Sequence, residues 1–160
     1  MPIATELSAL FRRDLTRVIQ QISAFPDEKT LWAVTPGMSN SAGNLALHLE
    51  GNLREYIGRQ LGGIAFERRR ALEFSTAGLP AGDLVERLSA VKEMAARVIE
   101  QMPDDAFETK FPEDVLGVPM TKRQLVIHLG GHLNYHLGQI DCLRRFLTGK
   151  GAISLAGLRS

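Results

Sequence analysis

The stretch HLGGHLNYHLGQI at residues 128–140 places three of the chain's four histidines at intervals of four residues. Its apolar residues recur every three or four positions, which is typical of an amphipathic α-helix. A second stretch, LALHLEGNLREYI at residues 45–57, carries the fourth histidine in a similar pattern. Side chains four residues apart share one face of a helix, with Cβ atoms about 5–6 Å apart. We therefore expect two helices that each present imidazole groups on one face.

Four long helices are predicted from the spacing of apolar residues, and no stretch alternates as a strand would. The expected helices span residues 5–25, 41–61, 83–102 and 121–147. Helix starts are marked by side-chain oxygens that can accept hydrogen bonds from the first free amides. The candidate N-caps are Ser39 or Ser41, Asp83 and Thr121. Each connection is long for a simple up-down bundle, which favours a crossover topology, and residues 64–74 are expected to hold one or two further turns.

The composition is that of an ordinary globular protein. The chain has 160 residues, of which 44% are hydrophobic and 23% charged. We expect one domain over residues 1–150 and a C-terminal tail over residues 151–160. The formal net charge of +1 gives no reason to expect nucleic acid or an anionic membrane as a partner. Without a long apolar run or a secretory signal, a cytoplasmic location is expected.

The orientation of the histidines follows from the helical repeat of about 100° per residue. His132 and His136 fall inside the apolar stripe of the last helix, whereas His128 falls on its edge. His48 lies at the edge of the apolar face of the second helix. An unpaired polar group inside a core costs about 1–3 kcal/mol, so several imidazoles together require a reason. A metal ion would supply one, and three protein ligands with an open position are typical of catalytic zinc.

The spacing also allows a second interpretation, in which these imidazoles are core residues with ordinary hydrogen-bond partners. We favour His132 and His136 as the ligand pair by their angle on the helix and place His128 at the rim. Cys142 lies about 120° around the helix from His136 and is interpreted as a buried structural residue.

Several other residues are candidates for supporting positions around the imidazoles. Asn52 and Gln139 could accept a hydrogen bond from an imidazole N–H. Tyr56 and Tyr135 could line a pocket beside the histidines. The basic run at residues 68–70 could attract an anionic thiol or a carboxylate, but we interpret it as a solvated face.

Two sequence elements together resemble a known family. Residues 39–57, SNSAGNLALHLEGNLREYI, contain an H-x-x-G-N element, and residues 132–145, HLNYHLGQIDCLRR, contain H-x-x-x-H-x-G-Q. Combined, they resemble the DinB-like superfamily, whose YfiT-type members are metalloenzyme-like. The resemblance covers nearly the whole chain.

This resemblance implies an all-α, four-helix bundle in an up-down-down-up order with long connections. It implies three metal ligands, His48, His132 and His136, and a metal that is usually zinc or nickel. Many members of the family look like homodimers. Characterised relatives include transferases and isomerases that use a low-molecular-weight thiol, such as bacillithiol or mycothiol.

A metal-dependent enzyme is the function that these features favour. Neutral imidazole ligands would leave the charge of a divalent ion uncompensated, so a bound thiol or water could be activated to attack a small electrophilic substrate. The alternative is a non-catalytic metal-binding bundle or a dimeric interaction bundle. A small molecule is the expected partner, and neither nucleic acid nor a membrane is expected.

Overall fold

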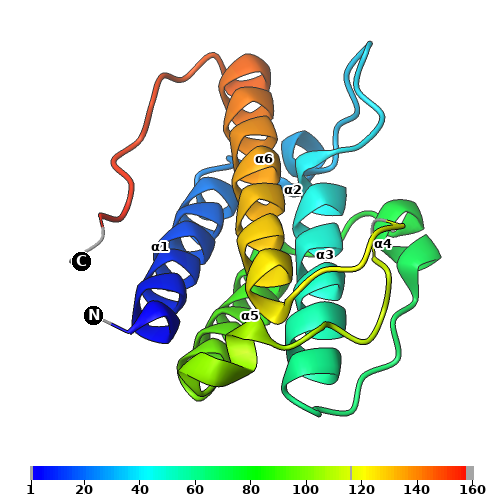
Figure 1. Ribbon diagram of the computed structural model, residues 1–160. Coiled ribbons are helices and arrows are strands. Elements are labelled where there is room, and N and C mark those ends of the chain that lie inside the picture. The colour runs from blue at the N-terminus through cyan, green and yellow to red at the C-terminus, as the bar shows by residue number, and fades with distance from the viewer. Residues whose placement is uncertain (1, 116, 158–160) are drawn as a thin grey trace.

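The computed structural model describes residues 2–115 and 117–157, and within these ranges it contains helices and no strands (Figure 1). The all-helical class is therefore confirmed. The long segments are α1 (Ile3–Ser23), α3 (Ala42–Leu53) continued by the π-helix η1 (Arg54–Leu61), α5 (Ala81–Glu100) and α6 (Lys122–Thr148). The short ones are α2 (Glu28–Leu31), α4 (Arg70–Ser75) and the 3-10 helix η2 (Asp104–Glu108). In the described part of the chain, no helix combines the length and apolar character needed to cross a membrane.

The long helices share one apolar core. Helix α1 packs against α5 and α6, and α3 packs against the same two helices from the other side. Each contributes side chains with almost no exposed surface, because its apolar residues recur with the helical period and form one continuous stripe. Examples of these buried side chains are Leu15, Leu49, Val91 and Leu129. The packing of α3 on α6 matters most for function, because these two helices carry all four histidines.

Two of the predicted N-caps are confirmed. The side chain of Ser41 accepts a hydrogen bond from the amide of Asn44, and that of Thr121 accepts one from the amide of Gln124. In both helices the third residue bonds back to the cap, so each start is a complete capping box. These caps fix where the two histidine-bearing helices begin.

The prediction that Asp83 caps the third long helix is wrong. Helix α5 begins at Ala81, and Pro80 precedes it with φ −56 and ψ 143, a backbone geometry typical of proline. Proline has no side-chain oxygen that could accept from the first amides of the helix, but its fixed φ suits a helix start, and its carbonyl accepts from the Asp83 amide at 3.1 Å. Asp83 instead lies in the first turn, where its carboxylate faces the positive end of the helix dipole.

The second long helix differs from the prediction in its last two turns. The α-helix ends at Leu53, and the chain continues as a π-helix to Leu61. This segment packs closely on α5: a Cβ on Gly58 would lie 3.1 Å from the sulfur of Met94, and a Cβ on Gly62 would lie 2.7 Å from Val98. The apolar period alone does not distinguish this wider π turn from an α turn.

The described part of the expected C-terminal tail, residues 151–157, lies along α1. Arg17 Nε donates to the carbonyl of Ala156 at 2.7 Å, and the Ala156 amide donates to Gln20 at 2.9 Å. The buried Arg144 of α6 donates to the carbonyl of Gly151 at 3.0 Å. Residues 158–160 of the expected tail lie outside the described residues.

The cap of α3 yields a first prediction. Ser41→Ala removes the acceptor for the Asn44 amide at a buried position and should lower the free energy of unfolding by about 1–2 kcal/mol. Urea denaturation measures the change, with an unchanged m-value expected. Ser39→Ala is the matched control, because Ser39 is exposed and lies outside the helix, so its effect should stay within about 0.5 kcal/mol. Equal effects for the two variants would contradict the role given to the cap.

Candidate metal centre

Three histidines from two helices converge on one point. His48 comes from α3, and His132 and His136 come from consecutive turns of α6. The Nε2 atom of His132 lies 3.1 Å from that of His48 and 3.0 Å from that of His136. One ligand atom from each of the three lies within 4.8 Å of the others. The described structure therefore brings together a group that could hold a metal ion.

The orientation of the three rings suits a common ligand. The ring planes of His48 and His132 meet at 78°, those of His48 and His136 at 86°, and those of His132 and His136 at 89°. Nearly perpendicular rings can direct a nitrogen toward a shared point without stacking on one another. Three nitrogens at about 2.0–2.1 Å from a tetrahedral zinc ion would be separated by about 3.3 Å. The two Nε2 separations fall within a few tenths of an ångström of that value.

In His48 and His136, the ring nitrogen that faces away from the cluster has a hydrogen-bond acceptor. His48 Nδ1 lies 2.9 Å from Glu73 Oε2, and His136 Nδ1 lies 2.7 Å from Gln139 Oε1. An ionised carboxylate and an amide oxygen can only accept, so we infer that Nδ1 carries the hydrogen in both rings. The Nε2 atoms that face the cluster therefore present lone pairs, as metal ligation requires.

The third ring, His132, is less satisfied. Its Nδ1 atom is buried and has no hydrogen-bond partner among the described residues. Its Nε2 atom lies between the lone pairs of His48 and His136, so a single hydrogen there can serve only one of them at full strength. A cation at this point would engage all three nitrogens. The donor set thus fits a divalent metal that accepts imidazole.

Burial keeps the cluster neutral. Desolvation lowers the pKa of all three imidazoles, and for His132 burial together with the charges of His136 and His48 lowers the pKa to about 4. For His48, the hydrogen bond to Glu73 raises the pKa but does not outweigh burial. At neutral pH the three side chains are therefore in the uncharged form that binds metals.

Glu73 and Arg68 also belong to the site, although the spacing of residues in the sequence did not indicate either of them. Arg68 Nε donates to Glu73 Oε1 at 2.7 Å, and the same guanidinium donates to Oε2 at 3.0 Å. The interpretation of residues 68–70 as a solvated face is wrong for Arg68, whose side chain is 13% exposed, but describes Arg69, whose side chain is 69% exposed. The expected helical turn in this connection is α4, and its one buried residue is Glu73. No repeat or motif distinguishes that glutamate in the sequence.

The remaining candidates lie at varying distances from the cluster. Gln139 contacts His136, and its amide nitrogen donates to the Tyr135 hydroxyl at 3.3 Å. Tyr135 is largely exposed, with its ring edge against His136 at a centroid distance of 5.2 Å. His128 is exposed on α6 and does not belong to the converging group.

The residues of the second helix differ from expectation. Asn52 makes no contact with an imidazole N–H; its Oδ1 atom is buried without a hydrogen-bond partner among the described residues, because Glu73 occupies the position beside His48 Nδ1. Tyr56 is partly buried, and the centroid of its ring lies 5.9 Å from the guanidinium carbon of Arg68.

Cys142 of α6 is exposed, so its interpretation as a buried structural residue is wrong.

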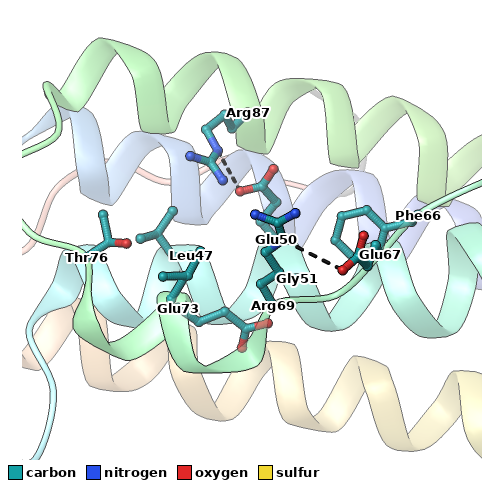
Figure 2. Close-up of a pocket in the computed structure, with 10 residues that line it drawn as sticks. Leu47, Glu50, Gly51, Phe66, Glu67, Arg69, Glu73, Thr76 and Arg87 are labelled. Atoms are coloured by element: carbon teal, nitrogen blue, oxygen red, sulfur yellow. Dashed lines mark hydrogen bonds and ion pairs between the residues drawn. The ribbon is translucent and has the colours of Figure 1, made fainter.

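A pocket of about 270 Å³ has Glu73 in its lining (Figure 2). It is formed between α3, α4 and α5, with apolar side chains beside paired charges. Glu50 and Arg87 form one of these pairs at 2.7 Å. Its lining includes Leu47, Phe66, Leu72 and Gly51. Glu73 therefore both lines this pocket and contacts His48.

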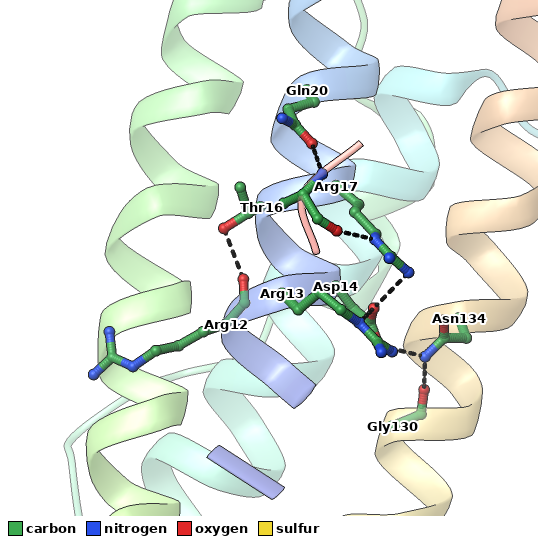
Figure 3. A network of polar contacts seen from close by, with 9 residues as sticks. Arg12, Arg13, Asp14, Thr16, Arg17, Gln20, Gly130 and Asn134 are labelled. Atoms are coloured by element: carbon green, nitrogen blue, oxygen red, sulfur yellow. Dashed lines mark hydrogen bonds and ion pairs between the residues drawn. The ribbon is translucent and has the colours of Figure 1, made fainter. Parts of the chain in front are cut away.

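A second polar network joins α6 to α1 (Figure 3). Asn134, between the two ligand candidates of α6, donates to the buried Asp14 of α1 at 2.7 Å. Asp14 also accepts from Arg13 at 2.6 Å and lies 3.5 Å from Arg17. Because Asn134 is held toward α1, the faces that bear His132 and His136 turn toward α3.

Comparison with known proteins agrees with this architecture. No curated protein sequence matches the chain. A crystal structure of a DinB-like protein from Bacillus cereus ATCC 10987 is similar, with a TM-score of 0.68 over 90% of this chain and 91% of that chain at 17% sequence identity. At this identity the likeness concerns the fold alone. Residues 10–140 match the family model of the DinB superfamily, and the chain therefore belongs to that superfamily.

Proposed function

We propose that this protein is a metal-dependent enzyme whose divalent ion is held by His48, His132 and His136. The observation that carries the proposal is the convergence of three Nε2 atoms, two of them on rings whose other nitrogen is already committed. Zinc or nickel is the proposed metal, because both accept neutral imidazole and both occur in the family that the sequence resembles.

The charges around the cluster support activation of a small nucleophile. A divalent ion in such a site lowers the pKa of a thiol or water that it binds and holds the resulting anion. The three imidazoles are neutral, and the charge of Glu73 is offset by Arg68 at 2.7 Å. The protein thus brings no net negative charge to the site. His132 and His136 are only half-buried, so a low-molecular-weight thiol could reach the cluster.

The proposed reaction is transfer of that thiol, or attack by water, on a small electrophilic substrate. We also propose that the chain is a four-helix bundle in an up-down-down-up order. The packing of α1 and α3 each against both α5 and α6 supports this topology. So does the long connection over residues 62–80, which carries α4 between α3 and α5.

Metal content tests the ligand assignment. Purified protein should carry about one divalent ion per chain. Alanine at His48, His132 or His136 should remove most of it, because each change deletes one of three ligands. His128→Ala is the matched control on the same helix and should retain the metal, since that side chain is exposed and lies outside the cluster. Elemental analysis of the dialysed proteins measures the outcome. Full occupancy in a variant that combines His132→Ala with His136→Ala would refute the assignment.

The pH dependence follows from the lowered imidazole pKa values. Protons compete with the metal for the same nitrogens, and burial moves this competition below the ordinary imidazole pKa of about 6.5. Metal should be retained at pH 7 and lost progressively between about pH 6 and pH 4. Without metal, the three imidazoles bind more protons in the unfolded chain than in the folded one over this range. Thermal stability should therefore also decrease as the pH is lowered. Equilibrium dialysis and thermal melts over this range measure both, and metal content that is constant down to pH 4 would exclude histidine ligation.

The alternative function is a non-catalytic interaction bundle, and one observation favours it. Three large apolar side chains, Ile127, Tyr135 and Phe146, are exposed along α6, which suits a homodimer through this helix.

A screen of low-molecular-weight thiols against epoxides and aryl halides separates the two functions. We expect metal-dependent thiol consumption by the wild-type protein and none by His48→Ala. Bound metal without turnover, together with a dimer that Phe146→Asp dissociates in light scattering, would support the interaction bundle instead.

A further inference from the structure

We propose that Glu73 is a positioning residue that selects which ring nitrogen His48 presents to the metal. Arg68 orients the Glu73 carboxylate, and Gly51 leaves the space that it occupies. This inference rests on the proposed function, because it concerns the same three-histidine site. It assigns a role to the short helix α4, which contributes no ligand of its own.

The contacts of Glu73 leave its carboxylate no freedom. The residue is 6% exposed, and both of its oxygens are engaged. Oε1 accepts from Arg68 Nε at 2.7 Å, and Oε2 accepts from the same guanidinium at 3.0 Å and from His48 Nδ1 at 2.9 Å. A two-point contact with a planar guanidinium fixes the plane of a carboxylate as well as its position.

The backbone of α4 is also anchored to α3. The side-chain nitrogen of Asn44 donates to the carbonyl oxygens of Glu73 at 3.1 Å and Thr76 at 2.9 Å. Asn44 belongs to the capping box of α3, so the same side chain fixes the start of that helix and the position of α4. The ring of Phe74 lies 5.1 Å from that of His48 and limits its rotation.

Gly51 provides the space that the carboxylate occupies. It lies on α3 beside Glu73, and both are labelled in Figure 2. A Cβ at position 51 would lie 2.1 Å from Glu73 Oε1 and 2.8 Å from its carboxyl carbon, distances that side chains do not adopt. Any residue larger than glycine would therefore displace the group that accepts the hydrogen of His48 Nδ1.

The consequence concerns the tautomer of His48. With an acceptor fixed at Nδ1, the hydrogen stays on that nitrogen and Nε2 keeps its lone pair toward the cluster. Without the acceptor, the neutral ring is shared between two tautomers, one of which carries a hydrogen on the ligand atom. Loss of such an outer partner typically lowers metal affinity by about 10–100-fold.

The main test removes the acceptor without leaving a buried charge. The double variant Arg68→Met, Glu73→Met replaces the ion pair with apolar side chains, which proteins often tolerate. We expect Co²⁺ affinity, measured by competition with a chelator, to fall by about 10–100-fold. Glu73→Gln should recover most of the affinity, because its amide oxygen can still accept from His48 Nδ1.

The matched control is Glu50→Met, Arg87→Met, which deletes another glutamate–arginine pair, bonded at 2.7 Å between the buried Glu50 of α3 and the exposed Arg87 of α5. Its affinity for Co²⁺ should equal that of the wild-type protein. A second pair of variants tests Gly51. Gly51→Ala should weaken Co²⁺ binding as the double variant does, whereas Gly82→Ala should not, because a Cβ at position 82 meets no atom within 4 Å.

Nuclear magnetic resonance of the metal-free wild-type protein gives a readout that does not depend on the stability of any variant. Two-bond ¹H–¹⁵N spectra should show His48 with its hydrogen on Nδ1. A hydrogen on Nε2 would overturn the inference, as would unchanged Co²⁺ affinity in the Arg68→Met, Glu73→Met variant. If the wild-type protein binds no Co²⁺, Zn²⁺ or Ni²⁺, the proposed function fails, and the His48 tautomer still decides the role of Glu73.

Discussion

The packing of α3 against α6 is the constraint on which the candidate site depends. A helix can place His132 and His136 side by side through its own repeat, but it cannot supply the third imidazole from the same turn. His48 reaches them only because the two helices are held together by fully buried side chains such as Leu49 and Leu129. The same packing removes water from the imidazoles, which lowers their pKa values and leaves them neutral. Core formation and ligand chemistry are thus consequences of one interface.

The parts of the fold that depend on neighbours in the sequence could be predicted. The helical period and the capping residues Ser41 and Thr121 are local features, and the structure agrees with them. The start of α5 and the π-helix after Leu53 were not predicted, for different reasons. The first has a local signal in Pro80, but Asp83 was chosen because aspartate is a common side-chain cap. The second accompanies a close approach of Gly58 and Gly62 to α5, which is a property of tertiary packing that local spacing does not reveal.

In the candidate site, too, features set by local sequence could be predicted and features set by tertiary packing could not. Spacing nominated His132 and His136, and the family resemblance added His48. Neither could identify Glu73, because its contact with His48 spans 25 positions and is made through a short helix in a connection. Arg68 was hidden for another reason: three consecutive arginines look alike in sequence, and only the packing of α4 decides which one is buried. Residues that position a ligand therefore leave a weaker sequence signal than the ligands, whose chemistry restricts them to a few residue types.

Glu73 contacts the outer nitrogen of His48 and is not one of the three candidate ligands. This position has an electrostatic consequence. A carboxylate in direct contact with a divalent ion would cancel part of its charge and weaken its effect on the pKa of a bound thiol or water. The Glu73 carboxylate is separated from the ligand position by the His48 ring and is paired with Arg68. It can therefore orient that ring while adding little net charge to the site. Gly51 permits this arrangement, since a larger residue would displace the carboxylate from His48. The connection between α3 and α5 thus combines firm positioning of a neutral ligand with a site that stays positive enough to hold an anionic nucleophile.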